Sequence, residues 1–179
     1  MQQSALLSVR ELLAHLLENP SSEVPFPEHL NEYLQDFVPS RLLQSHCFQI
    51  AFGVRDAEME ALYAKAYELY HAENYLIAAN LFRWLVLLNP FVTKYWMGLG
   101  ASQQLINDCK KALECYAVAY VLDDNSPYPH FYAYECYEAM GEESDALIAL
   151  QMASERALRD EKYAELAKEV QEISHGRTR

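Results

Sequence analysis

Residues 93–126 read TKYWMGLGASQQLINDCKKALECYAVAYVLDDNS, and the spacing of small and bulky side chains in this stretch predicts the fold. The small residues Gly100 and Ala112 stand at set distances from the bulky Trp96 and Tyr116. The same order of sizes recurs 34 residues earlier, and it recurs 34 residues later except that Tyr134 replaces the small residue of the third unit. The three sets of matching positions are Leu62, Ala66, Leu69, Ala78, Phe82, Leu85 and Pro90; Trp96, Gly100, Gln103, Ala112, Tyr116, Ala119 and Asp124; and His130, Tyr134, Tyr137, Ala146, Leu150, Ala153 and Leu158.

A 34-residue period with these side-chain sizes is typical of tetratricopeptide repeats. Two helices of one unit approach closely only where side chains are small, and bulky side chains fill the space beside them. The sequence therefore predicts an all-α fold of three tandem repeats, at about 59–92, 93–126 and 127–158, stacked as a superhelical solenoid. A helical N-terminal arm is expected over residues 1–55, and a C-terminal capping helix with a tail over 159–179.

The N-terminal arm opens with an amphipathic pattern over residues 5–18, and prolines follow at positions 20, 25 and 27. Two further helices are expected at about 29–38 and 40–50. One face of the first helix is apolar, because these residues recur at helical spacing: Leu6, Val9, Leu13 and Leu16.

Composition limits the class of partner. Of the 179 residues, 51% are hydrophobic and 22% are charged, as in globular proteins. A net charge of −12 argues against nucleic acid and anionic membranes, because both are bound through lysine and arginine. It favours a partner with basic or apolar segments, although an acidic surface can also serve solubility alone. No stretch has the pattern of a signal peptide or a membrane span, so a cytoplasmic location is expected.

No metal, cofactor or catalytic centre is expected. The four cysteines form no C-x-x-C pair and have no histidine at zinc-ligand spacing, so free thiols in a reducing compartment are expected. The chain has no nucleophile elbow, P-loop, glycine-rich dinucleotide turn or H-E-x-x-H motif. It is therefore predicted to bind proteins and not to be an enzyme.

In stacked helix pairs the first helix of each pair lines the concave side. Some positions of these first helices are not needed for packing between helices, and these positions are rich in tyrosine. A tyrosine side chain provides a flat apolar area and a hydroxyl at little entropic cost. An extended peptide with spaced apolar anchors is expected to bind there, although any single tyrosine can instead pack against a neighbouring helix. The expected residues are Tyr63, Tyr67 and Tyr70; Met97, Ala101 and Gln104; and Tyr128, Phe131, Tyr132 and Glu135.

Charge in the later repeats has one sign. No lysine or arginine occurs between Lys111 and Arg156, where nine aspartates and glutamates occur. This field can steer a basic client segment, or the charges can form an ordinary solvated outer face.

Three short motifs carry a resemblance to a known family. They are LYAKAY at 62–67, YWMGLGA at 95–101 and AYEC at 133–136. Together with Asn74-Tyr75, Gln104 and Gly141-Glu142, they resemble the class II type III secretion chaperones, the SycD/LcrH family. The resemblance spans roughly residues 55–175.

Membership of that family implies a cytoplasmic chaperone without ATP. Such a chaperone holds a secreted translocator protein in its concave groove and keeps it soluble and export-competent. A secreted gatekeeper protein is the alternative client, and a generic adaptor for endogenous partners is the alternative function. By position, the resemblance adds Leu88, Leu99 and Tyr116 to the client-binding residues, although packing alone places Leu99 and Tyr116 in the core.

The resemblance also implies a homodimer in the client-free state. Family dimers often use N-terminal helices, so the apolar face over residues 5–18 is an expected dimer contact, through Leu6, Val9, Leu13 and Leu16. The same helix can alternatively fold back over the groove.

Overall fold

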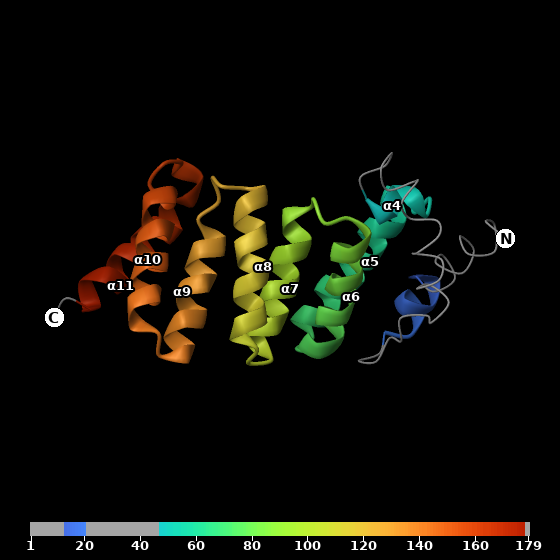
Figure 1. The fold of residues 1–179 in the computed structure, drawn as a ribbon, viewed down its shortest axis with the longest axis horizontal. Coiled ribbons are helices and arrows are strands. Elements are labelled where there is room, and N and C mark those ends of the chain that lie inside the picture. Colours follow the sequence, from blue (N-terminus) through green and yellow to red (C-terminus); the bar gives the residue numbers. More distant parts are fainter. Residues whose placement is uncertain (1–12, 21–46, 178–179) are drawn as a thin grey trace. The chain divides into compact units, whose positions relative to one another are not determined.

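A computed structural model describes residues 13–20 and 47–177, and every regular element within them is a helix (Figure 1). This confirms the expected all-α, repeat-based fold. A helix over 13–18 comes first; the helices expected at 29–38 and over most of 40–50 lie outside the described residues. The remaining elements are α4 (Phe48–Ala51), α5 (Asp56–His71), α6 (Tyr75–Leu88), α7 (Thr93–Leu105), α8 (Cys109–Leu122), α9 (Tyr128–Met140), α10 (Glu143–Ala157), η1 (Glu161–Tyr163) and α11 (Ala164–Arg177).

The chain comprises two compact units, residues 1–98 and residues 99–179. The first half of α7 belongs to the first unit and the second half to the second unit. Each unit has its own buried core and its own aromatic surface.

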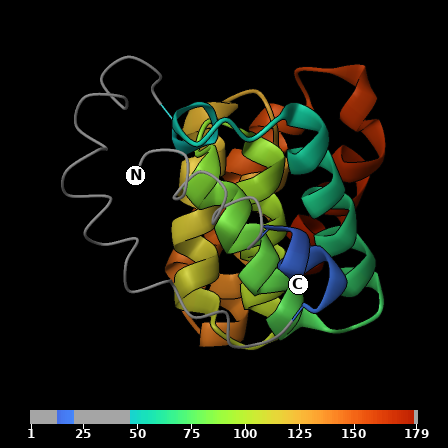
Figure 2. The ribbon, with the colours of Figure 1, turned by 90° about the vertical axis from the view of Figure 1, so that its right-hand side faces the viewer.

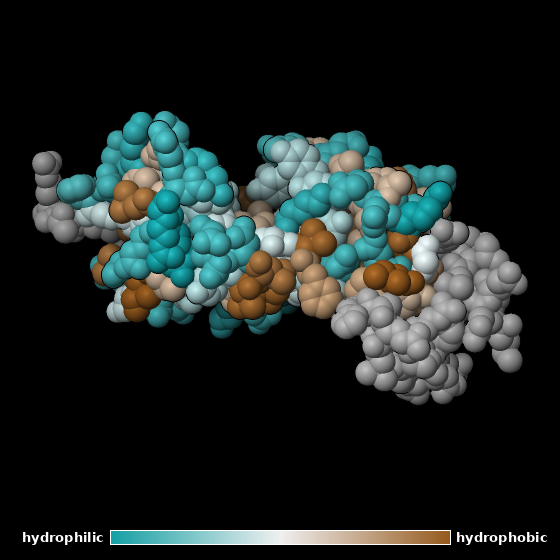
Figure 3. Space-filling view, turned by 90° about the horizontal axis from the view of Figure 1, so that it is seen from above, coloured by the Kyte–Doolittle hydropathy of each residue, from teal (hydrophilic) through white to brown (hydrophobic). Residues whose placement is uncertain are grey.

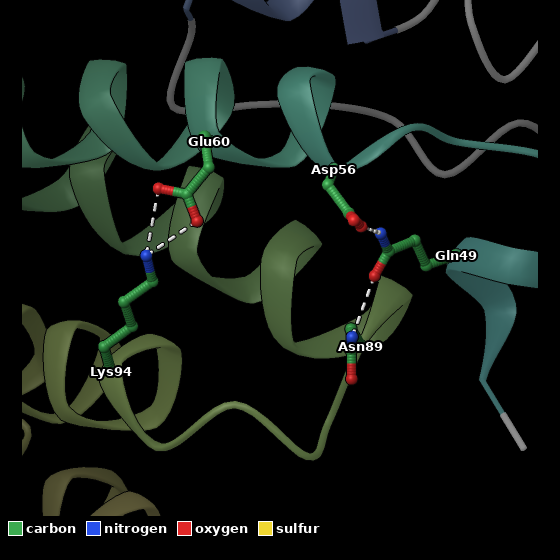
Figure 4. A network of polar contacts seen from close by, with 5 residues as sticks. All are labelled: Gln49, Asp56, Glu60, Asn89 and Lys94. Atoms are coloured by element: carbon green, nitrogen blue, oxygen red, sulfur yellow. Dashed lines mark hydrogen bonds and ion pairs between the residues drawn. The ribbon is translucent and has the colours of Figure 1, made fainter.

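In the first unit, α5 and α6 form a helical hairpin around the fully buried Ala66 and Ala78. The Phe82 ring of α6 lies against Gly98 of α7, at a distance that leaves no room for a side chain there. The short helix α4 lies at the end of the unit where α5 begins (Figures 1 and 2). Gln49 of α4 donates a hydrogen bond of 2.7 Å to Asp56 and accepts one of 2.8 Å from Asn89 (Figure 4). These two bonds join α4 to the start of α5 and to the residue that follows α6.

In the second unit, the second half of α7 packs on α8, where the Tyr116 ring lies against Gly100. The helices α9, α10 and α11 share one apolar core. Leu166 and Val170 bring α11 into that core, as expected of a helix that caps the last repeat. The buried members of this core are Phe131, Tyr134, Ala146, Ala149, Leu150, Ala153, Leu166 and Val170.

The three turns between paired helices share one backbone geometry. Glu73, Asn107 and Gly141 lie 34 residues apart and have left-handed φ values of 61°, 62° and 75°. In each turn the next residue donates its N–H to a carbonyl five residues back, which is the Schellman closure of a helix. Glycine adopts this conformation without strain, whereas glutamate and asparagine adopt it at some cost. The three closing bonds are Asn74 to Leu69, Asp108 to Gln103 and Glu142 to Tyr137, each of 2.9 Å.

A buried arginine joins three segments of the second unit. Arg156 of α10 is 8% exposed, and its guanidinium donates to the carbonyls of Asp124 and Met152 and to the Tyr120 hydroxyl. Its charge also lies 4.9 Å from the centre of the Tyr120 ring. The His130 ring lies 4.6 Å from that of Tyr120, and its buried Nε2 has no hydrogen-bond partner among the residues that the structure describes.

Acidification is expected to destabilise the fold through His130. Burial, and then the Arg156 charge, lower the pKa of His130 from 6.5 to about 4. As the pH falls, His130 therefore takes up a proton in the unfolded chain before it does so in the folded chain. The stability that neutral His130 provides is thus present above pH 6.5 and is lost as the pH falls towards 4. For this partly exposed ring we expect a loss of roughly 1 kcal/mol between pH 7 and pH 5, after allowance for solvent screening.

The measurement is urea unfolding at pH 7 and pH 5 for the wild type and for His130→Gln. The variant should lose less stability over this interval, and exposed His175→Gln should behave as the wild type. An equal pH dependence in His130→Gln and the wild type would show that His130 is not the titrating group.

Candidate client-binding surfaces

The first unit carries an aromatic cluster on one face of α5. Tyr63, Tyr67 and His71 follow one another at intervals of four residues, and so their rings lie along the same side of the helix. The Tyr63 and Tyr67 rings stack at 6.2 Å between centres, and the Tyr67 and His71 rings meet edge-on at 4.3 Å. Tyr67 remains 51% exposed. This cluster therefore presents an accessible aromatic face.

A lysine holds the inner end of this cluster in place. Lys94 of α7 forms an ion pair of 2.7 Å with Glu60 of α5 (Figure 4). Its Nζ lies 4.2 Å from the centre of the Tyr63 ring and 5.7 Å from that of Tyr95. Tyr95 is buried, and burial together with the Glu60 charge raises its pKa to about 12. Tyr95 therefore stays neutral in the physiological range and acts as an apolar support for Tyr63.

The second unit carries a row of four tyrosine rings. Tyr116 of α8 stacks on Tyr132 of α9 at 5.6 Å, and Tyr132 stacks on Tyr128 at 6.2 Å. Tyr163 of η1 continues the row, edge-on to Tyr128 at 5.7 Å. The inner end is buried, since Tyr116 is 1% exposed, whereas Tyr128 is 40% exposed. The tyrosine row therefore runs from the core to the surface of the unit.

Hydrogen bonds lie at the inner end of the tyrosine row, and a hollow lies beside Tyr128. At the inner end the Tyr116 hydroxyl donates to Gln104 Oε1 at 2.7 Å, and Gln104 Nε2 donates to Glu135 Oε2 at 2.9 Å. Further along the row, Tyr128 borders a hollow of about 410 Å³. That hollow is lined from α11 by Glu165, Leu166, Lys168, Glu169 and Glu172.

The residues predicted for client binding fall into three groups in the structure: exposed, half-buried and buried. Tyr67 and Tyr128 are exposed, and these are half-buried: Tyr63, Tyr70, Met97, Ala101, Gln104, Tyr132 and Glu135. Four others are buried: Leu88, Leu99, Tyr116 and Phe131. Phe131 belongs to the core of α9, α10 and α11, and Tyr116 fills the space beside Gly100. A buried side chain offers a client almost no area in this arrangement, so a direct part of these four residues in client binding stays a prediction.

Several residues of these surfaces were not predicted as site residues. Tyr163, Lys94, Glu60 and His71 come from positions that the repeat pattern does not mark. His71 has a local signal, since it continues the spacing of Tyr63 and Tyr67 by one further turn. The contact of Tyr163 with Tyr128 has no local signal, because it depends on where η1 lies relative to α9.

Some residues predicted for the dimer contact are also buried. Leu13 and Leu16 are buried within the protomer, so their side chains offer little area to a second copy in this arrangement. Leu6 and Val9 lie outside the described residues. The participation of this helix in a dimer stays a prediction.

Apolar side chains also reach the surface away from the tyrosines. The face in Figure 3 is mainly hydrophilic, with small separate apolar groups. The most exposed large apolar residues are Ile50, Phe91 and Leu76 in the first unit and Val121, Leu158, Ile148 and Leu147 in the second. None of the helices within the described residues is long and apolar enough to cross a membrane. In the same part of the chain, no group of three or more His, Cys, Asp or Glu side chains is placed to hold a metal ion.

Comparison with known proteins agrees with a helical repeat protein. Residues 93–125 match the tetratricopeptide repeat family model. The chaperone protein SicA of Salmonella typhimurium is 34% identical over 104 residues, which make up 58% of this chain and 63% of SicA. The chain thus spans somewhat less than two thirds of the length of that relative.

Two solved structures extend the similarity over most of their chains. One chain of the CopN-Scc3 complex is 37% identical, with a TM-score of 0.73 over 92% of this chain and 97% of that one. The Yersinia enterocolitica chaperone SycD, in complex with a peptide of the translocator YopD, is 27% identical, with a TM-score of 0.65 over 69% of this chain and 94% of that one. The chain belongs to the class II type III secretion chaperones, the SycD/LcrH family of tetratricopeptide repeat proteins.

Proposed function

We propose that this chain is a type III secretion chaperone that holds an extended segment of a secreted protein on its aromatic surfaces. While it is held in the cytoplasm, the client stays soluble and competent for export. The observation that carries the proposal is the tyrosine row, in which Tyr132, Tyr128 and Tyr163 follow one another and Tyr128 is exposed. Apolar anchors of an extended segment can pack on such ring faces, because rigid rings lose little conformational freedom on binding.

Two kinds of client are consistent with the relatives. SycD was solved with a peptide of the translocator YopD, and another relative forms part of a complex with CopN. A secreted translocator is the main candidate for this chain. A client of the CopN kind is the second candidate, because the CopN-Scc3 complex contains a relative with higher sequence identity, 37% against 27%. Neither surface contains a catalytic group in this proposal, and no chemical step is required for holding a client.

The proposal also includes a homodimer when no client is bound. A dimeric form of SycD has been solved, which supports pairing of this chain with a second copy. A client-free chain should then have twice its monomer mass of 20.6 kDa by light scattering.

The test is co-expression with YopD and, separately, with CopN. The wild-type chain should keep at least one client in the soluble fraction and co-purify with it. Tyr67→Ala combined with Tyr128→Ala should reduce the recovered client strongly, because each exposed ring is expected to contribute about tenfold in affinity. Light scattering on the purified chain, with and without client, reports the oligomeric state in the same experiment.

Phe91→Ala combined with Leu147→Ala is the matched control. It removes two exposed apolar side chains, one from each unit, that lie outside the tyrosine contacts. The control should retain the client at the wild-type level. Failure of both clients to co-purify with the wild type, or an equal loss in the control, would contradict the proposal.

A further inference from the structure

Glu135 is held in place by a chain of hydrogen bonds that begins in the core. The Tyr116 ring is packed between Gly100 and Tyr132, so its hydroxyl has little freedom of position. That hydroxyl donates to Gln104 Oε1 and thereby sets which way the Gln104 amide faces. The amide NH2 group then donates to Glu135 Oε2 at 2.9 Å. A glutamate on a helix surface would ordinarily sample several rotamers, whereas this one has its carboxylate oriented from inside the protein.

The carboxylate of Glu135 retains acceptor capacity. Gln104 is the hydrogen-bond donor to Glu135 Oε2, and within residues 13–20 and 47–177 no donor to Oε1 is present. An ionised carboxylate has about four acceptor positions and no donor. Glu135 is also half-buried and lies three and seven residues after Tyr132 and Tyr128, on the same face of α9. The unused acceptor positions therefore lie beside the tyrosine row.

The stretch of sequence around Glu135 supplies little positive charge. No lysine or arginine occurs between Lys111 and Arg156, and the guanidinium of Arg156 is bound to uncharged oxygens elsewhere in the unit. A partly buried carboxylate is costly without a counter-charge. The group that best meets this need is a cation, which forms a charge-assisted hydrogen bond with a carboxylate and is attracted to the face of an aromatic ring.

We infer that the client segment presents a lysine or arginine to Glu135, beside the Tyr132 ring. Glu135 is then a specificity-determining residue that selects client segments with a basic side chain next to an apolar anchor. Gln104 and Tyr116 are positioning residues that act through Glu135. This inference rests on the proposed function, since it assumes that a client segment lies along the tyrosine row.

The test uses three fluorescein-labelled synthetic peptides of about twelve residues with leucine and proline anchors. They differ at one central position, which is lysine, glutamine or glutamate. Fluorescence anisotropy gives their Kd values for the wild type. The lysine peptide should bind about tenfold more tightly than the glutamine peptide, and the glutamate peptide more weakly still. This ratio should fall in high salt, because the pair is only partly buried.

Variants of the chain assign that preference to residues. In Glu135→Gln the Kd values of the lysine and glutamine peptides should agree within about twofold, because the charge is gone. Tyr116→Phe keeps the ring and removes the hydroxyl, so it should reduce the preference for lysine without abolishing binding of the glutamine peptide. Glu169→Gln removes the same charge from the hollow beside Tyr128 and should leave the preference intact.

The outcomes separate this inference from the proposed function. If none of the three peptides binds the wild type, the peptide-holding surface itself is contradicted, and the inference falls with it. If all three bind equally, or if Glu135→Gln weakens all of them equally, Glu135 accepts from the client backbone or is structural, and only the inference is overturned. Loss of the lysine preference in Glu169→Gln in place of Glu135→Gln would also overturn it.

Discussion

Replacing Gly100 with alanine is expected to lower the free energy of unfolding by about 2–3 kcal/mol, because it overpacks a site with no spare volume. A Cβ atom at this position would lie 2.6 Å from Cε1 and 2.9 Å from Cδ1 of the Tyr116 ring. The ring cannot move away easily, because it stacks on Tyr132 and its hydroxyl is bonded to Gln104. The displacement would also disturb the tyrosine row and the orientation of Glu135. Client binding should therefore weaken together with stability.

Urea unfolding followed by circular dichroism measures this change. The control is Gly176→Ala, where an added Cβ meets nothing within 4 Å. This change in α11 should be neutral or slightly stabilising, because alanine is the better helix former. Gly98→Ala should destabilise the first unit in the same way, since its Cβ would overlap the Phe82 ring. A midpoint for Gly100→Ala equal to that of the wild type would show that the Tyr116 ring is free to shift.

Replacing Arg156 with methionine is expected to lower the free energy of unfolding by about 2–3 kcal/mol. Methionine retains the apolar stem but removes three hydrogen bonds, so the Asp124 carbonyl and the Tyr120 hydroxyl lose a donor within the protein. It also removes the cation from the face of the Tyr120 ring. The second unit should therefore lose much of the connection between α10 and the segment that joins α8 to α9.

Arg159→Met is the matched control for this prediction, because Arg159 is exposed and lies three residues further along the chain, in the turn after α10. Its effect should stay within about 0.5 kcal/mol, as for most surface substitutions. Thermal melts monitored by circular dichroism compare the two variants directly. Equal melting temperatures for Arg156→Met and Arg159→Met would contradict a stabilising role for the buried guanidinium.

Part of the candidate site follows from sequence reasoning, and part does not. Tyr67 and Tyr128 were predicted as positions that packing leaves unused, and both are exposed. Phe131 was predicted for the same surface but is buried, because it faces the core that α9 shares with α10 and α11. Two residues that follow one another in sequence lie on adjacent sides of a helix. The 34-residue period therefore cannot show which neighbouring helix covers each side. Tyr163 completes the tyrosine row from a separate element, which no local pattern indicates.

The resemblance to the chaperone family and the packing argument led to different expectations for Leu99 and Tyr116. The resemblance placed both at the client surface, whereas packing placed both in the core. Both are buried in the structure. Tyr116 nevertheless contributes to the surface indirectly, because it supports the Tyr132 ring and orients Gln104.

The period of residues 93–126 by itself determined that the chain folds as tandem pairs of helices. Close approach of two helices requires small side chains at positions set by 3.6 residues per turn, and that requirement is local and repeated, so it is visible in one sequence. Only the structure decided the left-handed turn at Glu73, since glutamate does not favour that conformation and helix closure imposes it. It also decided the contact between Gln104 and Glu135, which lie 31 residues apart. Such a contact depends on the distance between packed helices, and this distance is set by the side chains of both helices together.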